Sequence, residues 1–203
     1  MDFAITRCRV GDEKRLSLVG KATFLETYAG NTEAADILAF VDAEHSAERY
    51  KLWLESDFAK IWIAETIPGH SAIGYAVALT PSDDSFGIEI KRLYVLHRFH
   101  QNGLGHLLMN EILATARHEG IAELFLRVQK ANQSAVAFYS RNGFDLVGEE
   151  SFRVGTRDHE ALVMRRALDT PSESCRERAR AQIIRYRGRP ARSSRETSRR
   201  GPR

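Results

Sequence analysis

The stretch that decides the fold lies near the middle of the chain and reads IEIKRLYVLHRFHQNGLGHLL over residues 88–108. Its first part is mostly apolar and predicts the end of a long strand over residues 86–95. A basic turn with two glycines follows, and apolar residues at helical spacing then predict an amphipathic helix over residues 103–118. A strand, a glycine-containing turn and a helix therefore follow one another directly.

The turn has the properties of a phosphate-binding site. Gly103 and Gly105 lack Cβ atoms, so a ligand can approach the backbone closely. The free N–H groups and the positive dipole end of a helix N-terminus favour an anion, and His97, Arg98 and His100 add basic groups. The turn is neither a Walker loop, which ends in Gly-Lys-Ser/Thr, nor a dinucleotide fingerprint, which has a third glycine.

The same turn resembles the acyl-CoA-binding signature of the GNAT superfamily of N-acetyltransferases, Gln/Arg-x-x-Gly-x-Gly/Ala after a strand. The glycines of Gly103-Leu104-Gly105 fit this signature, while His100 stands at its first position. A second block, NQSAVAFYSRNGF over residues 132–144, is similar to the family's Asn-x-x-Ala-x-x-Phe-Tyr-x-x-x-Gly-Phe. With both motifs in the family's order, the chain is identified as a member over about residues 3–168.

The resemblance implies an α/β domain of the α+β type. Its sheet is expected to be mixed, mostly antiparallel and of six or seven strands, splayed between the fourth and fifth strands and flanked by helices. The periodicity of the chain predicts strands over 3–8, 59–66, 71–79, 86–95, 123–128, 144–154 and 159–168. Helices are expected from an Asp12 cap to about Tyr28, after a Thr32 cap, and over 46–54, 103–118 and 133–142. Leu38 and Leu107 are expected on buried helix faces.

By the same resemblance, the gap between the fourth and fifth strands holds the pantetheine arm of acetyl-CoA, the co-substrate. The strand backbone is expected to pair with this arm, and the amides of the turn to wrap the pyrophosphate. Asn132 is expected to hydrogen-bond the arm, and its alternative role is a helix N-cap. The residues assigned to cofactor binding are Leu93, Tyr94, Val95, Gln101, Asn102, Gly103, Leu104, Gly105, His106 and Asn132.

Tyr139 is assigned to catalysis because it occupies the tyrosine position of the second motif. The resemblance implies that it protonates the leaving thiolate, and a phenol with a pKa near 10 suits a thiolate of similar basicity. The alternative is an aromatic anchor on a helix face.

Glu89 is the candidate base, because an amine that is protonated at physiological pH must lose a proton before it attacks. It alternates in phase with Leu93 and Val95 along the expected strand, although a β-bulge would change that phase. The alternative is a strand carboxylate paired with Lys91 or Arg92. His97 and His100 are the alternative bases, and the reaction requires no metal.

The N-terminal half is expected to carry the acceptor site. TFLETYAGNT over residues 23–32 and KRLYV over residues 91–95 resemble the polyamine and small-amine branch of the family. Tyr28 is the best single candidate for lining the site, and its alternative is a core aromatic that closes the helix. Acidic residues in this region would attract a cationic amine, although ordinary polar helix faces explain most of them. They are Glu26, Glu33, Asp36, Asp42 and Glu44.

Charge divides the 203-residue chain into two parts. Residues 1–168, the expected acetyltransferase domain, carry a formal net charge of −4, and residues 169–203 carry +7 with 11 Arg. The second part is poor in apolar residues and is expected to be a largely disordered tail, with a short helix around residues 172–187. Its two interpretations are a solvated extension and an electrostatic handle for nucleic acid.

Cysteine content and hydropathy predict a cytoplasmic protein without a membrane span. Cys8 and Cys175 cannot form a disulfide framework. The chain lacks both an apolar run near the ~20 residues of a span and the apolar stretch of a signal peptide.

The leading hypothesis is an enzyme that transfers acetyl from acetyl-CoA to a primary amine by direct attack through a tetrahedral intermediate. The expected acceptor is a small or polyamine-like amine, and the alternative acceptor is a protein N-terminus or lysine. The alternative class is a non-catalytic CoA-binding module with a nucleic-acid-binding tail. Pairing of two copies into a homodimer stays open.

Overall fold

The computed structural model describes residues 2–30, 32–80, 87–154 and 157–168, and within residues 152–159 it describes the backbone alone. The chain divides into two units, Met1–Thr170 and Pro171–Arg203. The expectations for the tail, namely disorder, a helix around residues 172–187 and nucleic-acid binding, fall outside the described residues.

The elements follow the expected order, with most bounds within one or two residues of the prediction. The strands are β1 (Asp2–Arg7), β2 (Ala59–Ile67), β3 (Ala72–Leu79), β4 (Gly87–Val95), β5 (Glu123–Gln129), β6 (Asp145–Val154) and β7 (Arg157–Ala167). The helices are α1 (Glu13–Tyr28), α2 (Ala34–Glu44), α3 (Ala47–Leu54), α4 (Leu104–His118) and α5 (Gln133–Arg141), with a short 3-10 turn η1 (His97–Phe99).

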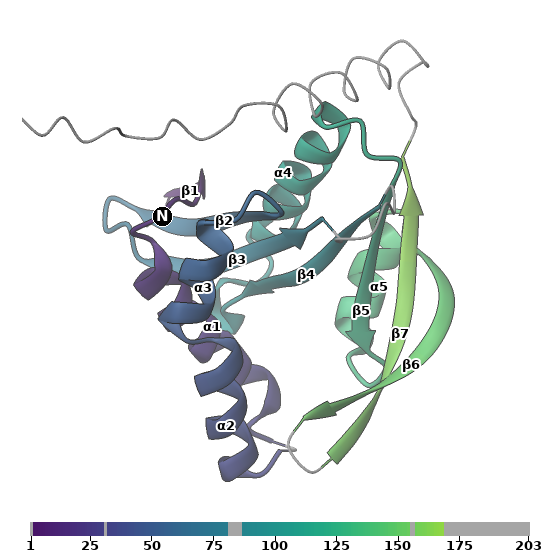
Figure 1. Ribbon diagram of the computed structural model, residues 1–203, viewed down its shortest axis with the longest axis horizontal. Coiled ribbons are helices and arrows are strands. Elements are labelled where there is room, and N and C mark those ends of the chain that lie inside the picture. Colours follow the sequence, from purple (N-terminus) through teal and green to yellow (C-terminus); the bar gives the residue numbers. More distant parts are fainter. Residues whose placement is uncertain (1, 31, 81–86, 155–156, 169–203) are drawn as a thin grey trace, which may run out of the picture. The chain divides into compact units, whose positions relative to one another are not determined.

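The strands form one mixed sheet of seven strands in the order β1-β2-β3-β4-β5-β7-β6 (Figure 1). β4 and β5 run parallel, and the other neighbouring strands in this order run antiparallel. This arrangement confirms the mixed, mostly antiparallel α/β fold of the GNAT type.

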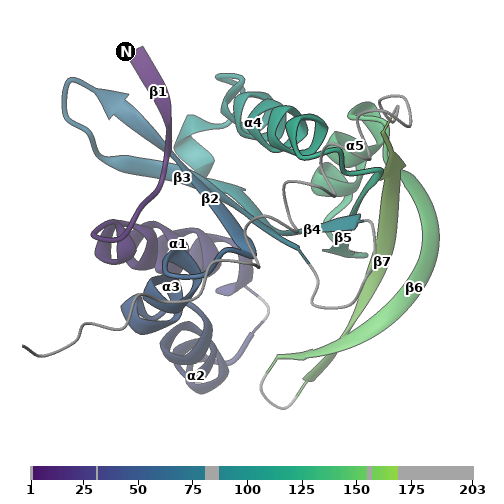
Figure 2. The same cartoon turned by 45° about the horizontal axis from the view of Figure 1, so that its top comes forward.

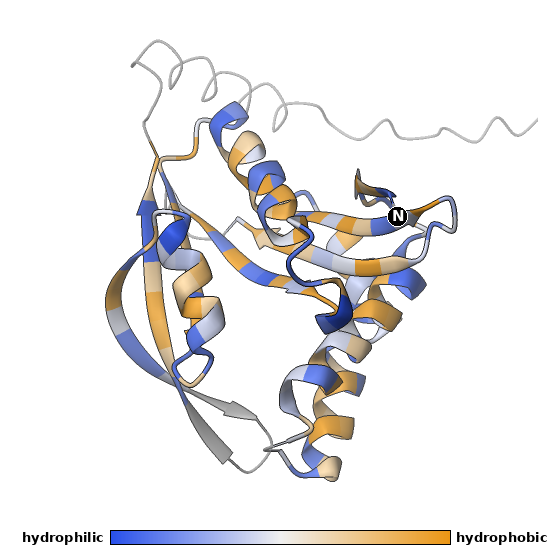
Figure 3. Cartoon of the chain, turned by 180° about the vertical axis from the view of Figure 1, so that it is seen from behind, coloured by the Kyte–Doolittle hydropathy of each residue, from blue (hydrophilic) through white to orange (hydrophobic). Residues whose placement is uncertain are grey.

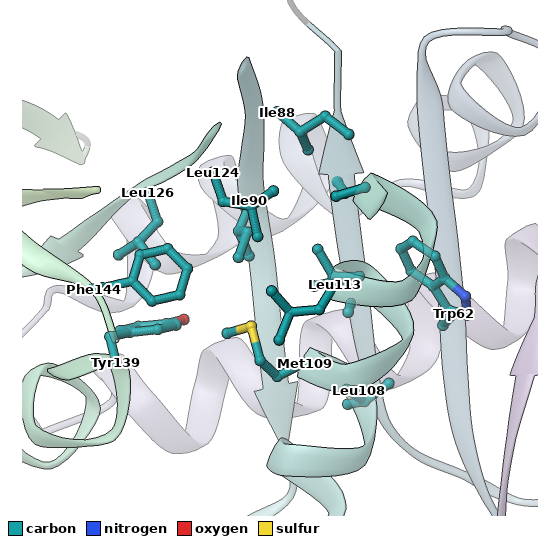
Figure 4. Close-up of a cluster of buried hydrophobic side chains, with 14 of the residues drawn as sticks. Trp62, Ile88, Ile90, Leu108, Met109, Leu113, Leu124, Leu126, Tyr139 and Phe144 are labelled. Carbon is teal, nitrogen blue, oxygen red and sulfur yellow. The ribbon is translucent and has the colours of Figure 1, made fainter. Parts of the chain in front are cut away.

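Helices cover both faces of the sheet. α1 and α3 lie on one face, and α4 and α5 lie on the other (Figures 1 and 2). The larger hydrophobic core, which includes Trp62, Ile90, Met109, Leu126 and Phe144, fills the space under α4 and α5 (Figure 4). A second core under α1 and α3 contains aromatic and aliphatic residues of the helices and of β2 and β3. Burial of these apolar faces is the main favourable term in folding.

Local signals explain several element ends. The Ser46 side chain accepts a hydrogen bond from the N–H of Arg49 over 3.1 Å and caps α3. Asn142 is the C-cap of α5, and Gly143 follows with a φ of 78°, in the left-handed region where glycine is favoured.

Three local expectations are wrong, and a fourth is confirmed in position alone. Asp12 is the N-cap of α1 as expected, although its side chain makes no capping hydrogen bond, whereas Glu33 rather than Thr32 is the N-cap of α2. Leu38 and Leu107 are 63% and 45% exposed, so neither lies on a buried helix face. Apolar residues at the border of a helix stripe can face solvent, and the packing of the neighbouring elements decides which do.

Candidate active site

β4 and β5 part from each other inside the sheet. They pair over three rungs, of which the last joins Glu89 to Phe125. Beyond that rung β4 continues to Val95 and β5 to Gln129, and the two ribbons diverge (Figures 1 and 2). The expected splay is therefore present.

A β-bulge at Lys91 shifts the alternation of side chains between the two faces of β4. β3 pairs Ala78 with Ile90 and Val77 with Arg92, which leaves Lys91 as an extra residue. Ile90 therefore belongs to the core under α4, whereas Arg92 contacts side chains of α3 on the opposite face.

The bulge decides which side chains share a face with Glu89. Leu93 and Val95 pack against the core under α4. Tyr94 packs against the core under α1 and α3, as does Leu79, which pairs with Glu89 on β3. Glu89 therefore shares a face with Tyr94 and not with Leu93 and Val95, so the expected phase is wrong, and the bulge is the physical reason.

The peptide groups of Leu93 and Val95 point into the gap between the strands. The N–H of Leu96 donates to the carbonyl of Ile73 on β3 over 2.8 Å, and successive residues of an antiparallel strand direct their peptide groups to opposite sides. The peptide N–H and C=O groups of Leu93 and Val95 thus point away from β3, whereas those of the intervening Tyr94 point toward it. His100 Nε2 lies 2.8 Å from the Val95 carbonyl oxygen, so this carbonyl already has a hydrogen-bond partner.

α4 begins at an open helix N-terminus after a strongly hydrophilic loop (Figure 3). Its N-cap is Gly103, with a φ of 76° and no atom within 4 Å of the position that a Cβ would take. Since glycine offers no capping side chain, the first N–H groups and the helix dipole favour an anion. The loop is braced by Asn102 Nδ2, which donates to the carbonyls of Phe99 and His100 over 3.1 Å each. Gln101 adopts a φ of 65°.

The first turn of α4 lies against α5. Leu104 is buried, and a Cβ on Gly105 would stand 3.3 Å from the Phe138 ring. His106 is exposed, with its ring centroid 5.1 Å from that of Phe138. The structure thus brings the residues expected at the pyrophosphate to one helix N-terminus.

Asn132 caps α5. Its Oδ1 accepts hydrogen bonds from the Ala135 N–H over 3.1 Å and from the Ser134 hydroxyl over 2.9 Å. The alternative role as an N-cap is confirmed, and a bond from this residue to the cofactor arm stays a prediction.

The Tyr139 side chain is buried in the core under α5, between Phe138 and Phe144. Its hydroxyl points toward Met109 of α4 (Figure 4). Burial, and then the nearby phenol of Tyr94, raise the pKa of Tyr139 well above the ordinary value for a phenol. The group is therefore neutral at physiological pH and can act as a proton donor.

Glu89 lies at the point where β4 and β5 part, and its carboxylate is paired with cations. Arg127 Nη1 on β5 lies 3.0 Å from Glu89 Oε1, and Lys91 Nζ lies 3.4 Å from the same oxygen. Arg92, the other expected partner of Glu89, instead contacts side chains of α3, with its Nη1 2.9 Å from the Tyr50 hydroxyl. The carboxylate is thus held by two cations, as the alternative of a strand ion pair describes, and its role as the base stays a prediction.

Tyr28 lies at the end of α1 and is buried. Its ring stacks on Phe24 with centroids 4.4 Å apart, and its phenol lies near that of Tyr94. The alternative role, a core aromatic that closes the helix, is what these contacts describe, and a role in the acceptor site stays a prediction.

Three of the acidic residues near the expected acceptor mouth are bound to described groups. Glu26 Oε2 accepts from the N–H of His97 over 2.9 Å, and Asp42 pairs with Lys21 at 3.4 Å. Glu44 is paired with Arg92 at 3.2 Å and with Arg49 at 3.1 Å. Their charges are therefore already balanced or used in hydrogen bonds.

A buried polar network on the α3 face was not predicted from the sequence. Arg92 donates to the Tyr50 hydroxyl, which lies 3.0 Å from His45 Nδ1, and a Cβ on Gly20 would clash with both partners at about 2.5 Å. Tyr75, next to this network, has the one fully buried side-chain polar atom without a hydrogen-bond partner in the described part of the chain. No sequence signal marks these residues, because the bulge alone turns Arg92 toward α3.

Comparison with known proteins agrees with this geometry. The acetyltransferase (GNAT) family model matches residues 22–144. An uncharacterized N-acetyltransferase of Mycobacterium tuberculosis is 31% identical over 159 residues, which are 77% of this chain and 98% of the relative.

Solved structures share the fold. The PaiA N-acetyltransferase of Thermoplasma acidophilum in complex with coenzyme A has a TM-score of 0.69 at 21% identity, over 83% of this chain and 100% of that one. The ribosomal-protein-S18-alanine N-acetyltransferase of Escherichia coli has a TM-score of 0.61 at 15% identity, over 85% and 97% of the two chains.

The fold and the site define an acyltransferase that uses acetyl-CoA. The chain belongs to the acetyltransferase (GNAT) family, and it is an acetyl-CoA-dependent N-acetyltransferase. Of the helices in the described ranges, none is long and apolar enough to cross a membrane. Among the same residues, no group of three or more His, Cys, Asp or Glu side chains could hold a metal ion.

Proposed function

We propose that the enzyme acetylates a primary amine of a small molecule by direct attack on the thioester. The observation that carries the proposal is the buried Tyr139 phenol beside a splayed sheet in which the peptide groups of Leu93 and Val95 point into the gap. The groups that a thioester aminolysis needs, a proton donor, a hydrogen-bond donor for the oxyanion and a base, all have candidates around this gap.

Acetyl-CoA supplies the activated acetyl group. Its pyrophosphate would be held by the backbone amides from Gln101 to His106, because Gly103 leaves the helix N-terminus open. The peptide group of Leu93 and the N–H of Val95 would pair with the pantetheine arm, and Asn132 on the facing helix would contact the same arm.

Tyr139 Oη would donate a proton to the departing sulfur. Its neutral state favours donation over proton uptake. The N–H of Leu93 points into the gap and is the natural donor to the developing oxyanion. Both groups are held by core packing and need no large reorganisation.

Glu89 would remove the proton from the acceptor nitrogen, directly or through one water. It lies on the face opposite the α4 core, so the acceptor would approach from the side of α1 and α2, where Tyr28 would line its path. The ion pair with Arg127 holds the carboxylate in place at the edge of the gap.

The charges on this side favour an acceptor with a single amine over a polycation. A polyamine needs several uncompensated carboxylates, whereas Glu26, Asp42 and Glu44 already bind described partners. The polyamine interpretation rests on the resemblance of residues 23–32 and 91–95.

A cytoplasmic location and a homodimer also remain predictions.

Free-thiol release from acetyl-CoA across a panel of amines would test the proposal. The panel would contain small monoamines, diamines, spermidine, amino acids, aminoglycosides and short peptides. Turnover with a small amine that is lost in Tyr139→Phe would support it. Turnover with peptides alone would favour a protein N-terminus or lysine as the acceptor. Coenzyme A binding with no turnover would favour the binding module, and deletion of residues 169–203 would then test nucleic-acid binding.

A further inference from the structure

A chain of charged side chains crosses the face of the sheet at the point where β4 and β5 part. Arg127 of β5 stands at its centre. Its Nη1 lies 3.0 Å from Glu89 Oε1 on β4, and its Nε lies 2.6 Å from Glu150 Oε2 on β6. β7 lies between β5 and β6, and backbone pairing between β4 and β5 has ended before Arg127. The guanidinium therefore connects β4, β5 and β6, of which no two pair with each other at this level.

The position of Arg127 relative to the last rung gives this contact its importance. Backbone pairing between β4 and β5 ends at Glu89 and Phe125. Arg127 comes two residues later on the same face of β5 as Phe125, with its guanidinium 5.9 Å from the Phe125 ring centroid. It therefore reaches back to β4 from a level at which the two backbones have already separated.

The geometry at Glu89 distinguishes its two carboxylate oxygens. The contacts of Arg127 and of Lys91 both fall on Oε1. Neither of these two cations therefore has to move for a proton to be taken up on Oε2. Glu150 holds Arg127 independently through Nε, so the guanidinium stays neutralised when Glu89 takes up a proton.

We propose that Arg127 is a positioning residue for the reaction. It holds Glu89 at the apex of the splay with Oε1 engaged, so that Oε2 receives the proton that leaves the acceptor nitrogen. The N–H bond of the acceptor breaks, an O–H bond forms on Oε2, and the proton later passes to solvent. This inference rests on the proposed role of Glu89 as the base.

The chain offers a matched control in Lys130, which also lies next to β6. Its side chain is 42% exposed, as is that of Arg127, and it pairs with Glu149 at 2.9 Å and with Glu160 at 3.4 Å. Lys130→Gln therefore removes a similar exposed cation and two similar ion pairs without touching Glu89.

Steady-state kinetics with the acceptor found in the amine panel would test the proposal. We expect Arg127→Gln to lower kcat by about 10- to 100-fold, below the full contribution of a general base, with the KM for acetyl-CoA unchanged. Arg127→Lys should recover part of the loss, because a single ammonium keeps a charge near Glu89 but cannot span both carboxylates. Lys130→Gln should keep the wild-type kcat.

A double variant separates positioning from a general structural effect. In the Glu89→Gln background, Arg127→Gln should cost almost nothing further, because the two residues act as one unit. An equal loss in both backgrounds, or a wild-type kcat for Arg127→Gln, would overturn the positioning role. A wild-type kcat for Glu89→Gln alone would instead refute the proposed base.

A measurement without turnover checks the contact itself. The Nε–Hε resonance of Arg127 in the full chain should shift in Glu89→Gln and in Glu150→Gln. It should stay in place in Glu149→Gln, which alters the partner of Lys130. An unchanged resonance in Glu89→Gln would show that the contact does not persist in solution.

Discussion

The carboxylate of Glu26 on α1 accepts a hydrogen bond from the backbone N–H of His97, 71 residues further along the chain, with Oε2 and the nitrogen 2.9 Å apart. His97 opens the loop that leads from β4 into the N-terminus of α4. One side chain thus connects the helix expected to line the acceptor site with the loop expected to bind the pyrophosphate.

Removal of this connection should loosen the loop. We expect Glu26→Ala to raise the KM for acetyl-CoA by about two- to tenfold, the range of one ordinary hydrogen bond, with kcat little changed. Asp42→Ala is the matched control, because Asp42 pairs with Lys21 and does not contact the loop. A rise in the KM for the amine alone would contradict a role at the cofactor loop.

Gly103→Ala tests the open helix N-terminus. The φ of 76° should make alanine cost about 1–2 kcal/mol of stability, and the new methyl group would stand where the pyrophosphate is expected. The KM for acetyl-CoA should therefore rise steeply. Gly11→Ala provides the control, since Gly11 also has a positive φ and open space around it but lies before α1. Equal effects of both substitutions on KM would contradict the phosphate site.

Tyr139→Phe should lower kcat by about 10²- to 10⁴-fold, as expected for the loss of a general acid. Coenzyme A affinity measured by calorimetry should stay near that of the wild type, because phenylalanine keeps the packing against Phe138 and Phe144. A kcat close to the wild-type value would leave Tyr139 as an aromatic anchor.

Tyr75→Phe, in contrast to Tyr139→Phe, should change stability and not turnover. The Tyr75 hydroxyl is buried without a hydrogen-bond partner among the described residues, and a buried unsatisfied polar group is destabilising. Its removal should raise the free energy of unfolding by about 1 kcal/mol and leave turnover unchanged. Chemical denaturation would measure the change, and a loss of stability would show that the hydroxyl has a polar partner in solution.

The open helix N-terminus of α4 was the part of the candidate site that could be predicted from the sequence. A ligand can approach the backbone closely where side chains are absent, and Gly103 and Gly105 mark such a place, so their contact with the pyrophosphate stays a prediction. The periodicity of apolar residues likewise located the strands and helices, because each element must bury one face.

The faces of β4 could not be predicted, because the bulge at Lys91 depends on how β3 pairs with β4. The same bulge turns Arg92 toward Glu44, 48 residues away in sequence. Arg127 reaches Glu89 over 38 residues. These contacts depend on the distance between elements in space, and neither composition nor periodicity carries that information.

His45 should make the protein sensitive to acid. It is 2% exposed, and burial, followed by the charges of Arg92 and Lys21, lowers its pKa to about 3. The hydrogen-bond order agrees with a neutral ring. Arg92 donates to the Tyr50 oxygen, so the Tyr50 hydroxyl donates to His45 Nδ1. A proton on that nitrogen would prevent it from accepting this hydrogen bond.

The sign of the pH dependence follows from the lowered pKa. Below an ordinary histidine pKa of about 6.5 the unfolded chain binds a proton that the folded protein refuses, so stability falls as the pH falls from about 6.5 toward 3. The slope should approach about 1.4 kcal/mol per pH unit for this one group. Urea denaturation between pH 7.5 and 4.5 would measure it.

His45→Asn should flatten this dependence, because the asparagine oxygen can accept from Tyr50 and does not titrate. The variant will be less stable than the wild type at pH 7.5, since the ring contacts with Phe24 and Phe40 are lost, but the difference should shrink as the pH falls. His118→Asn, at an exposed position, should keep the wild-type slope. Parallel curves for the wild type and His45→Asn would mean that the ring takes up a proton as readily in the folded protein as in the unfolded chain, and the Arg92–Tyr50–His45 order would then be wrong.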